Sequence, residues 1–362
     1  MFERVDRAPP DPILGLSEAV KADPNPDKIN LGAGIYKDEA GRTPVLSVVK
    51  KAEQRLLAEE DSKSYLPISG APEYAAAVQE LLFAPGHEIV ESGRAATVQT
   101  PGGTAALRVA ADLVRKFAPD AAVRVSDPTW SNHYGVFQAA GLEIEPYPYY
   151  DADTHSLDAD GMLAAIGDMS QGDVIVLHGC CHNPTGVDPT PEQWRRIAEA
   201  VADRGLLPLV DLAYQGFGSG LEEDAAGTRI VCERCPEALV TTSCSKNFSL
   251  YSERVGALTA VGPSPEVAER VMSQLKIVIR RLYSNPPAHG ALIVATVLAD
   301  PGLRAEWEEE LGTMRRRIHD MRRLFVETLR TRAPAADFSF ILDQNGVFSW
   351  SGLSEEQVGR LR

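Results

Sequence analysis

Lys246 is the side chain whose surroundings most clearly indicate chemistry. It lies in the segment Ser243-Cys-Ser-Lys246-Asn-Phe-Ser-Leu-Tyr-Ser-Glu-Arg254, which follows a β-rich run. A lysine amine in such a position can form an imine, and the polar residues around it can hold an anion. The sequence therefore predicts a nucleophilic lysine beside an anion-binding site.

A second candidate is Asp211, in Asp211-Leu-Ala-Tyr214-Gln-Gly-Phe217, directly after the apolar run Leu-Leu-Pro-Leu-Val. A carboxylate at the end of a buried strand needs a cationic partner or several hydrogen bonds. The pyridinium nitrogen of pyridoxal phosphate is such a partner, and the protonated ring then withdraws electrons from an α-carbanion. Tyr214, one turn further along, could direct its phenol at the ring oxygen. The alternative for Asp211 is a helix cap.

Other segments offer groups that a flat, phosphorylated cofactor needs. Gly102-Gly103-Thr104 precedes an expected helix, whose backbone N–H groups and dipole can bind phosphate, although such a turn is weak evidence alone. Trp130 is either a core residue or a plane that stacks on a ring. A further polar segment is His178-Gly-Cys-Cys-His-Asn183-Pro-Thr-Gly186.

Two alternative enzyme classes fit these residues poorly. Ser243-x-x-Lys246 also occurs in β-lactamase-type serine enzymes, but the Ser-Asp-Asn and Lys-Thr-Gly motifs of those enzymes do not occur in the sequence. Gly32-x-Gly34 lacks the third glycine of a dinucleotide-binding fingerprint and is followed by Tyr36 and charged residues. We therefore expect neither a serine nucleophile nor a Rossmann cofactor.

The cysteines do not form a recognisable metal or redox motif. The cysteines at 180 and 181 are adjacent, so they lack the spacer of a zinc site that would include His178 and His182. Cys232-x-x-Cys235 stands outside a thioredoxin-like context. With five cysteines in a large chain, not all can pair, and we expect free thiols and no metal.

Composition limits the class of protein. The 362 residues are 44% apolar, which is enough for a substantial core. The 36 basic residues against 51 acidic ones give a net charge of −15, which repels nucleic acid. The first residues lack the apolar region of a secretory signal, and no uninterrupted apolar stretch reaches the roughly 18 residues of a membrane span. We expect a cytoplasmic enzyme that binds neither nucleic acid nor membrane.

Short β-rich runs alternate with helical patterns between about residues 95 and 262, which predicts βαβ units and a mostly parallel sheet. The expected strands are 97–100, 122–125, 174–177, 207–210, 239–242 and 257–261, and the expected helices are 105–117 and 192–203. The candidate residues fall just beyond strand ends, where open α/β sheets bind ligands. Residues after about 300 have the pattern of charged amphipathic helices, such as 307–330.

These segments together resemble the class I (fold-type I) pyridoxal-phosphate aminotransferases, especially the bacterial aspartate and aromatic amino-acid enzymes. The resemblance covers essentially the whole chain. Its most specific parts are Cys-His-Asn-Pro-Thr-Gly, Asp-x-Ala-Tyr-Gln-Gly-Phe, Ser-Lys-Asn-Phe-x-Leu-Tyr-x-Glu-Arg-Val-Gly and Tyr-Ser-Asn-Pro-Pro, in the family's order and spacing. It implies an α/β fold with a large cofactor domain over 44–305. The arm and part of a smaller domain would occupy 1–43, and the rest of that domain 306–362.

The resemblance also implies roles for individual residues. Lys246 would form the imine with the cofactor and act as general base, and Asp211 would pair with the pyridine nitrogen. Tyr214 and Asn183 would hydrogen-bond the ring oxygen, and Trp130 would stack on the ring. The phosphate would be held by Gly103, Thr104, Ser243, Arg254 and, from a neighbouring subunit of a homodimer, Tyr65.

For the substrates, the resemblance implies an amino acid and a 2-oxo acid exchanged by ping-pong transfer. Arg280 lies where the family places the arginine that binds a side-chain carboxylate across the dimer, the alternative being a surface arginine. Gly34 would bring backbone close to the substrate, where Asn183 and Trp130 would also lie. Aspartate, glutamate and aromatic amino acids all remain open as donors, and 2-oxoglutarate and oxaloacetate as acceptors.

The sequence stops in a helical pattern, Gln357-Val-Gly-Arg-Leu-Arg362, a few dozen residues before a family member would end. The missing part would contain the arginine for the substrate's α-carboxylate, so a truncated chain that binds the cofactor with little turnover is one alternative. Another fold-type I activity, a β-lyase or an α-decarboxylase, is the second alternative.

Overall fold

The computed structural model of the chain describes residues 2–8, 14–30, 32 and 34–361. They divide into two compact units, with the boundary between Thr43 and Pro44. The described part of the first unit contains a short 3-10 helix, η1 (Phe2–Arg4), and the helix α1 (Leu14–Ala22). None of the helices in the described ranges is long and apolar enough to cross a membrane.

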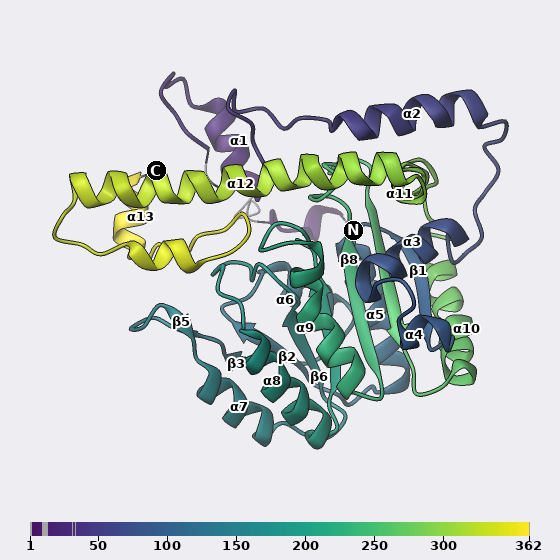
Figure 1. Cartoon of the computed structure of the whole chain (residues 1–362). Coiled ribbons are helices and arrows are strands. Elements are labelled where there is room, and N and C mark those ends of the chain that lie inside the picture. Colours follow the sequence, from purple (N-terminus) through teal and green to yellow (C-terminus); the bar gives the residue numbers. More distant parts are fainter. Residues whose placement is uncertain (1, 9–13, 31, 33, 362) are drawn as a thin grey trace. The chain divides into compact units, whose positions relative to one another are not determined.

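A seven-stranded sheet forms the centre of the second unit (Figure 1), with the strand order β1-β9-β8-β7-β6-β2-β3. The strands are β1 (Ala95–Pro101), β2 (Val123–Asp127), β3 (Ile144–Pro148), β6 (Val174–His178), β7 (Leu207–Leu212), β8 (Ala238–Ser243) and β9 (Val255–Val261). β9 is antiparallel to both β1 and β8, whereas the other neighbouring pairs are parallel. The predicted α/β fold with a mostly parallel sheet is confirmed.

Helices cover the sheet with two apolar layers. The helices α5 (Gly103–Phe117), α6 (Asn132–Ala139) and α10 (Pro265–Leu282) enclose one core with alternate residues of the strands, such as Val98, Val125 and Leu209. In the other layer, α9 (Leu221–Arg234) packs on β7 and β8 and against α8 (Pro191–Arg204) and α3 (Pro72–Phe83), and α7 (Ala159–Asp168) packs against α8. Burial on both faces explains why the central strands read as continuous apolar runs.

Each of the strands and helices expected between residues 95 and 262 is present, with bounds that differ by a few residues. β3 was not expected because it contains Pro146 and Pro148, and proline is tolerated mainly in edge strands, where β3 lies. A small separate pair, β4 (Tyr150–Asp151) and β5 (Ser156–Leu157), was also missed.

The remaining helices of this unit are α2 (Ser47–Glu59), α4 (Glu88–Glu91), α11 (His289–Ala299), α12 (Pro301–Arg332), η2 (Ser339–Asp343) and α13 (Glu355–Leu361). The expected amphipathic helix over 307–330 is the main part of α12. Its buried Trp307 stacks on Phe248 at 4.4 Å and donates an indole hydrogen bond of 2.8 Å to the carbonyl of Asn247. α12 therefore anchors the loop that carries Lys246. The proposed domain boundary between residues 305 and 306 falls inside this helix and stays a prediction.

Candidate active site

The carboxyl ends of β6, β7 and β8 meet at one edge of the sheet. Because these strands are parallel and in register, Asp211 lies between His178 on β6 and Thr241 on β8. The loops that leave the same edge carry Asn183, Tyr214 and Lys246. The sheet thus gathers side chains from three separate sequence motifs, as expected for the ligand site of an open α/β sheet.

Asp211 has hydrogen-bond donors on both of its oxygens. Thr241 donates from Oγ1 to Oδ1 at 2.8 Å, and Nε2 of His133, on α6, lies 3.3 Å from Oδ2. Burial raises the pKa of this carboxyl, but the hydrogen bonds that it accepts from His133 and Thr241 bring it below its ordinary value. Asp211 is therefore held as a carboxylate without a Lys or Arg side chain among its hydrogen-bond partners in the described ranges.

A chain of hydrogen bonds leads to Asp211 from the loop after β6. The backbone N–H of Asn183 donates to Nδ1 of His178 at 3.2 Å, and Nε2 of His178 lies 3.1 Å from Oγ1 of Thr129. That hydroxyl lies 2.8 Å from Nδ1 of His133. Burial lowers the pKa of His178 well below its ordinary value, so its ring is neutral and Nε2 carries the hydrogen. The hydroxyl of Thr129 then donates a hydrogen bond to Nδ1 of His133, and the Nε2–H of His133 donates one to Asp211.

Lys246 lies in the same space, half-buried, with its ammonium nitrogen 4.5 Å from the centre of the Tyr214 ring. Burial lowers the pKa of this amine below its ordinary value, the Asp211 carboxylate raises it part of the way back, and Arg254 lowers it again. A lower pKa increases the neutral fraction of the amine at a given pH, and only the neutral amine attacks a carbonyl. The geometry therefore favours a nucleophilic lysine.

Among the described residues, three side chains carried by the loops at this edge make no hydrogen bond. Within the ranges that the structure describes, the side-chain polar atoms of Asn183, Tyr214 and Lys246 have no hydrogen-bond partner, and Tyr214 is buried. Trp130 is half-buried, with its ring edge-on to His133 at 5.4 Å. The roles assigned to these residues stay predictions.

A cradle for an anion lies at the amino end of α5. Because β9 runs antiparallel, its first residue Val255 pairs with Pro101, so that Arg254 lies beside the turn formed by Gly102 and Gly103. A Cβ atom on Gly102, where φ is +85°, would lie 2.3 Å from Nη2 of Arg254. The positive φ, which L side chains rarely adopt, favours glycine here, and the missing Cβ leaves room for the guanidinium beside the backbone.

Serine hydroxyls complete the cradle. Ser243, at the end of β8, lies against Gly103, where an added Cβ would be 3.3 Å from the Cβ of Ser243. Ser245 accepts a hydrogen bond of 3.3 Å from Nη1 of Arg254. The backbone N–H groups at the start of α5, including that of Thr104, and the helix dipole add further positive potential. Ser245 was missed in the sequence, although it stands beside Ser243 and Lys246 in the same motif.

The structure does not bring every predicted residue into this site. Tyr65 is 91% exposed, and Arg280 is exposed at the end of α10, where it donates to Ser284. Gly34 belongs to the first compact unit, whereas the sheet and the loops of the site belong to the second. The assigned roles of these three residues stay predictions.

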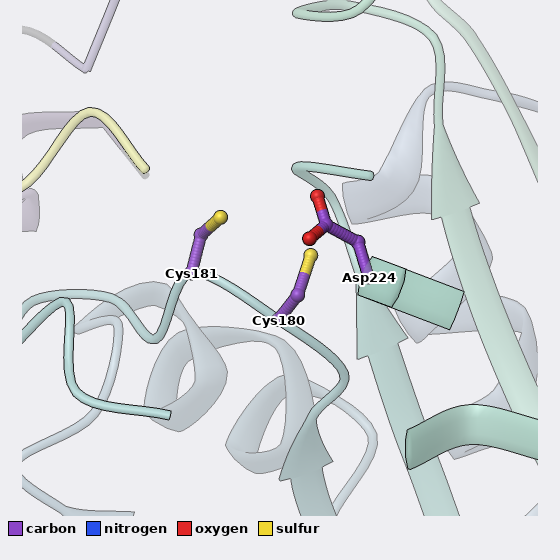
Figure 2. Close-up of side chains that lie close together, drawn as sticks. All are labelled: Cys180, Cys181 and Asp224. Atoms are coloured by element: carbon purple, nitrogen blue, oxygen red, sulfur yellow. The ribbon is translucent and has the colours of Figure 1, made fainter. Parts of the chain in front are cut away.

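The described residues contain a buried group of possible metal ligands, Cys180, Cys181 and Asp224, whose ligand atoms lie within 4.8 Å of one another (Figure 2). The Asp224 carboxylate already accepts four backbone N–H groups, from Gly216, Gly218, Ser219 and Gly220. Burial raises the pKa of Cys180 well above its ordinary value and that of Cys181 to about 11. Protonated thiols and a saturated carboxylate are poor ligands, so we assign no metal to this group.

Comparison with known proteins identifies the family. Residues 26–361 match the family described as aminotransferase class I and II. The chain is 56% identical over its whole length to an aspartate aminotransferase of Salmonella typhi and 48% identical to an aromatic-amino-acid aminotransferase of Pseudomonas aeruginosa. It spans 91% and 90% of those proteins, respectively. A crystal structure of an aromatic-amino-acid aminotransferase from Burkholderia pseudomallei, covalently bound to pyridoxal phosphate, superposes with a TM-score of 0.97. That structure is 50% identical, and the match covers 100% of this chain and 91% of the other. This chain belongs to the class I and II aminotransferases.

Proposed function

We propose that the protein is a pyridoxal-phosphate-dependent aminotransferase that moves an amino group from aspartate, glutamate or an aromatic amino acid to a 2-oxo acid. The observation that carries this proposal is that a partly buried carboxylate, Asp211 near the end of β7, and a half-buried amine of lowered pKa, Lys246 in the loop after β8, lie at the same edge of the sheet. An imine-forming amine next to an anion that can hold a ring cation is what amino-group chemistry on this cofactor requires.

The residues of the site fit that cofactor. Asp211 is a carboxylate whose side-chain hydrogen-bond partners, among the described residues, are the hydroxyl of Thr241 and the imidazole of His133. It therefore suits a protonated ring nitrogen. The cradle formed by Gly103, Thr104, Ser243, Ser245 and Arg254 has the charge and N–H groups that a phosphate needs. The otherwise unpartnered side chains of Asn183 and Tyr214 suit the ring oxygen, and Trp130 suits the face of the ring.

Bound here, the cofactor supplies an electron sink for the pair left on the substrate's Cα. The chain's own residues supply the rest. Asp211 keeps the ring nitrogen protonated, and the hydrogen bonds from Thr241 and His133 keep Asp211 ionised. The Lys246 amine would act as general base for the proton on the substrate's Cα and as general acid in returning that proton to the former aldehyde carbon of the cofactor. The ring of Tyr214 lies 4.5 Å from the Lys246 amine, at the place where that amine would act.

We also propose that the enzyme is a homodimer with shared active sites. Tyr65 is 91% exposed, an unusual position for an aromatic side chain, and Arg280 is exposed on α10 beside the exposed apolar residues Ile277 and Leu282. A second copy that covers these residues would bury that apolar surface. Location in the cytoplasm is a further proposal, supported by five cysteines that are all free thiols.

The products of a single half-reaction test the proposed activity. Protein loaded with pyridoxal phosphate and mixed with aspartate, glutamate, tyrosine or phenylalanine in a stopped-flow instrument should yield the corresponding 2-oxo acid and pyridoxamine phosphate in equal amounts. A β-lyase would instead release ammonia and leave the cofactor in its aldehyde form, and an α-decarboxylase would release carbon dioxide. Either of these product patterns would contradict the proposal.

Arg280 should affect substrates selectively. We expect Arg280→Ala to lower kcat/KM for aspartate and glutamate by roughly 10- to 100-fold, because a charge-assisted hydrogen bond contributes about 1.5–3 kcal/mol. Phenylalanine, which has no second carboxylate, should change far less. Steady-state rates with the four amino acids measure the difference, and Arg270→Ala, in an exposed position on the same helix, is the control. Equal losses for both substrate classes would exclude Arg280 from the specificity site.

A further inference from the structure

Thr241 is a hydroxyl residue buried directly beside Asp211. It lies on β8, in register with Asp211 on β7, and none of its side chain is exposed. Its Oγ1 donates to Oδ1 of Asp211 at 2.8 Å. A buried hydroxyl is costly unless it is hydrogen-bonded, and valine would fill the same place in the strand with nearly the same shape. The hydroxyl of Thr241 therefore needs an explanation beyond packing.

We propose that Thr241 is a positioning residue, which fixes the orientation of the Asp211 carboxylate and favours its ionised form. The proposal rests on the proposed function, because the carboxylate is taken to face the ring nitrogen of the cofactor. Nothing in the Ser-Lys-Asn-Phe motif points to Thr241, which precedes that motif and becomes a neighbour of Asp211 only through strand pairing.

The geometry supports this role because the two donors to Asp211 come from different sides. Thr241 holds Oδ1 from the neighbouring strand β8, and His133 holds Oδ2 from α6. The terminal torsion of an aspartate side chain is broad and nearly two-fold, so one donor leaves the carboxylate plane free to turn. Two donors on different oxygens fix the plane and still leave one acceptor site on each oxygen.

The effect of the Thr241 hydroxyl on the pKa of Asp211 acts together with the effects of the other charged and titratable groups around this carboxylate. Burial raises the pKa of Asp211, and the hydrogen bonds from His133 on α6 and from Thr241 lower it, whereas His178 on β6 is neutral. The charge of Asp211 raises the pKa of Lys246, which lies in the loop after β8. Burial raises the pKa of Tyr214, in the loop after β7, and the charge of Asp211 raises it further. Removal of the Thr241 hydroxyl should raise the basicity of the carboxylate, so that the shared proton moves from the ring nitrogen toward Asp211.

The ¹⁵N resonance of the cofactor's ring nitrogen measures where this proton lies. Full-length protein loaded with ¹⁵N-labelled pyridoxal phosphate should show a protonated ring nitrogen across neutral pH. In Thr241→Val we expect the resonance to move toward the unprotonated position, equivalent to a shift of about one pKa unit, and kcat to fall by roughly tenfold. Thr241→Ser, which restores the hydroxyl, should return both values toward those of the parent.

The matched control is Thr259→Val. Thr259 is fully buried in the same sheet, on β9, and its hydroxyl lies 2.9 Å from that of Thr97, away from Asp211. The variant Thr259→Val should lower the melting temperature of the protein without moving the ¹⁵N resonance of the cofactor's ring nitrogen. If Thr241→Val does not fold, Thr241→Ala removes the same hydroxyl with a smaller side chain and carries the same expectation.

Two outcomes separate the inference from the function on which it rests. An unchanged ring resonance in Thr241→Val or Thr241→Ala, with cofactor bound, would refute the positioning role and leave the aminotransferase intact. A parent protein without any bound-cofactor resonance would refute the proposed function itself. A resonance that moves equally in Thr241→Ser would also overturn the inference, because the serine retains the hydroxyl.

Discussion

Lys246→Ala should abolish the covalent link to the cofactor and lower the rate of transamination by on the order of 10⁴-fold or more. The variant loses both the amine that forms the imine and the general base, and proton transfer by a positioned base alone contributes about 10²–10⁴-fold. Reduction with borohydride followed by peptide mass spectrometry locates the link, and single-turnover kinetics measures the rate. The fold should survive, because the loop is also held by Trp307 through the carbonyl of Asn247.

The control for this variant is Lys50→Ala. Lys50 is exposed on α2, and its single ion-pair partner among the described residues is Glu53, at 2.7 Å, so its removal should leave the covalent link and the rate close to those of the parent. Because burial lowers the pKa of Lys246, the rate at which the parent binds free pyridoxal phosphate covalently should rise with pH and level off below the pH expected for an ordinary lysine. A link found on another lysine would remove Lys246 from the centre of the mechanism.

Asp211→Ala should lower the rate of transamination by at least about 10³-fold, because the ring nitrogen loses the anion that keeps it protonated and with it most of the electron sink. His133 and Thr241 would then donate toward a space without an acceptor, which should also weaken cofactor binding. Single-turnover kinetics with aspartate and equilibrium binding of pyridoxal phosphate measure the two effects. Activity within about tenfold of the parent, a barrier change of only ~1.4 kcal/mol, would contradict the assignment.

A second buried aspartate provides the comparison. Asp173 is buried directly before the amino end of β6, whereas Asp211 lies level with the carboxyl end of that strand. The Oδ2 atom of Asp173 lies 2.7 Å from Nη2 of Arg124. Asp173→Asn should destabilise the fold without the loss in rate expected for Asp211→Ala, because it lies far from the cofactor site. Thermal unfolding of both variants separates loss of stability from loss of chemistry.

Local sequence allowed the central strands, the helices that face them and the motif residues to be predicted. The strands stand out because they are buried on both faces and therefore apolar throughout, and Asp211 and Lys246 stand out because polar residues end such runs. The edge strand β3 could not be predicted in the same way, since its prolines mask the strand pattern.

Tertiary structure alone decided which groups surround those motif residues. His133 and Thr241 reach Asp211 across 78 and 30 positions of sequence, and nothing in their own segments marks them. Arg254 joins Gly102 because β9 runs antiparallel, a direction that its apolar sequence does not specify. Hydrophobic patterns record burial, which each residue carries locally, whereas strand order and direction depend on contacts between distant segments. The sequence by itself therefore determined the fold class and the chemical groups, and only the packed sheet decided how the carboxylate, the amine and the cradle are held together.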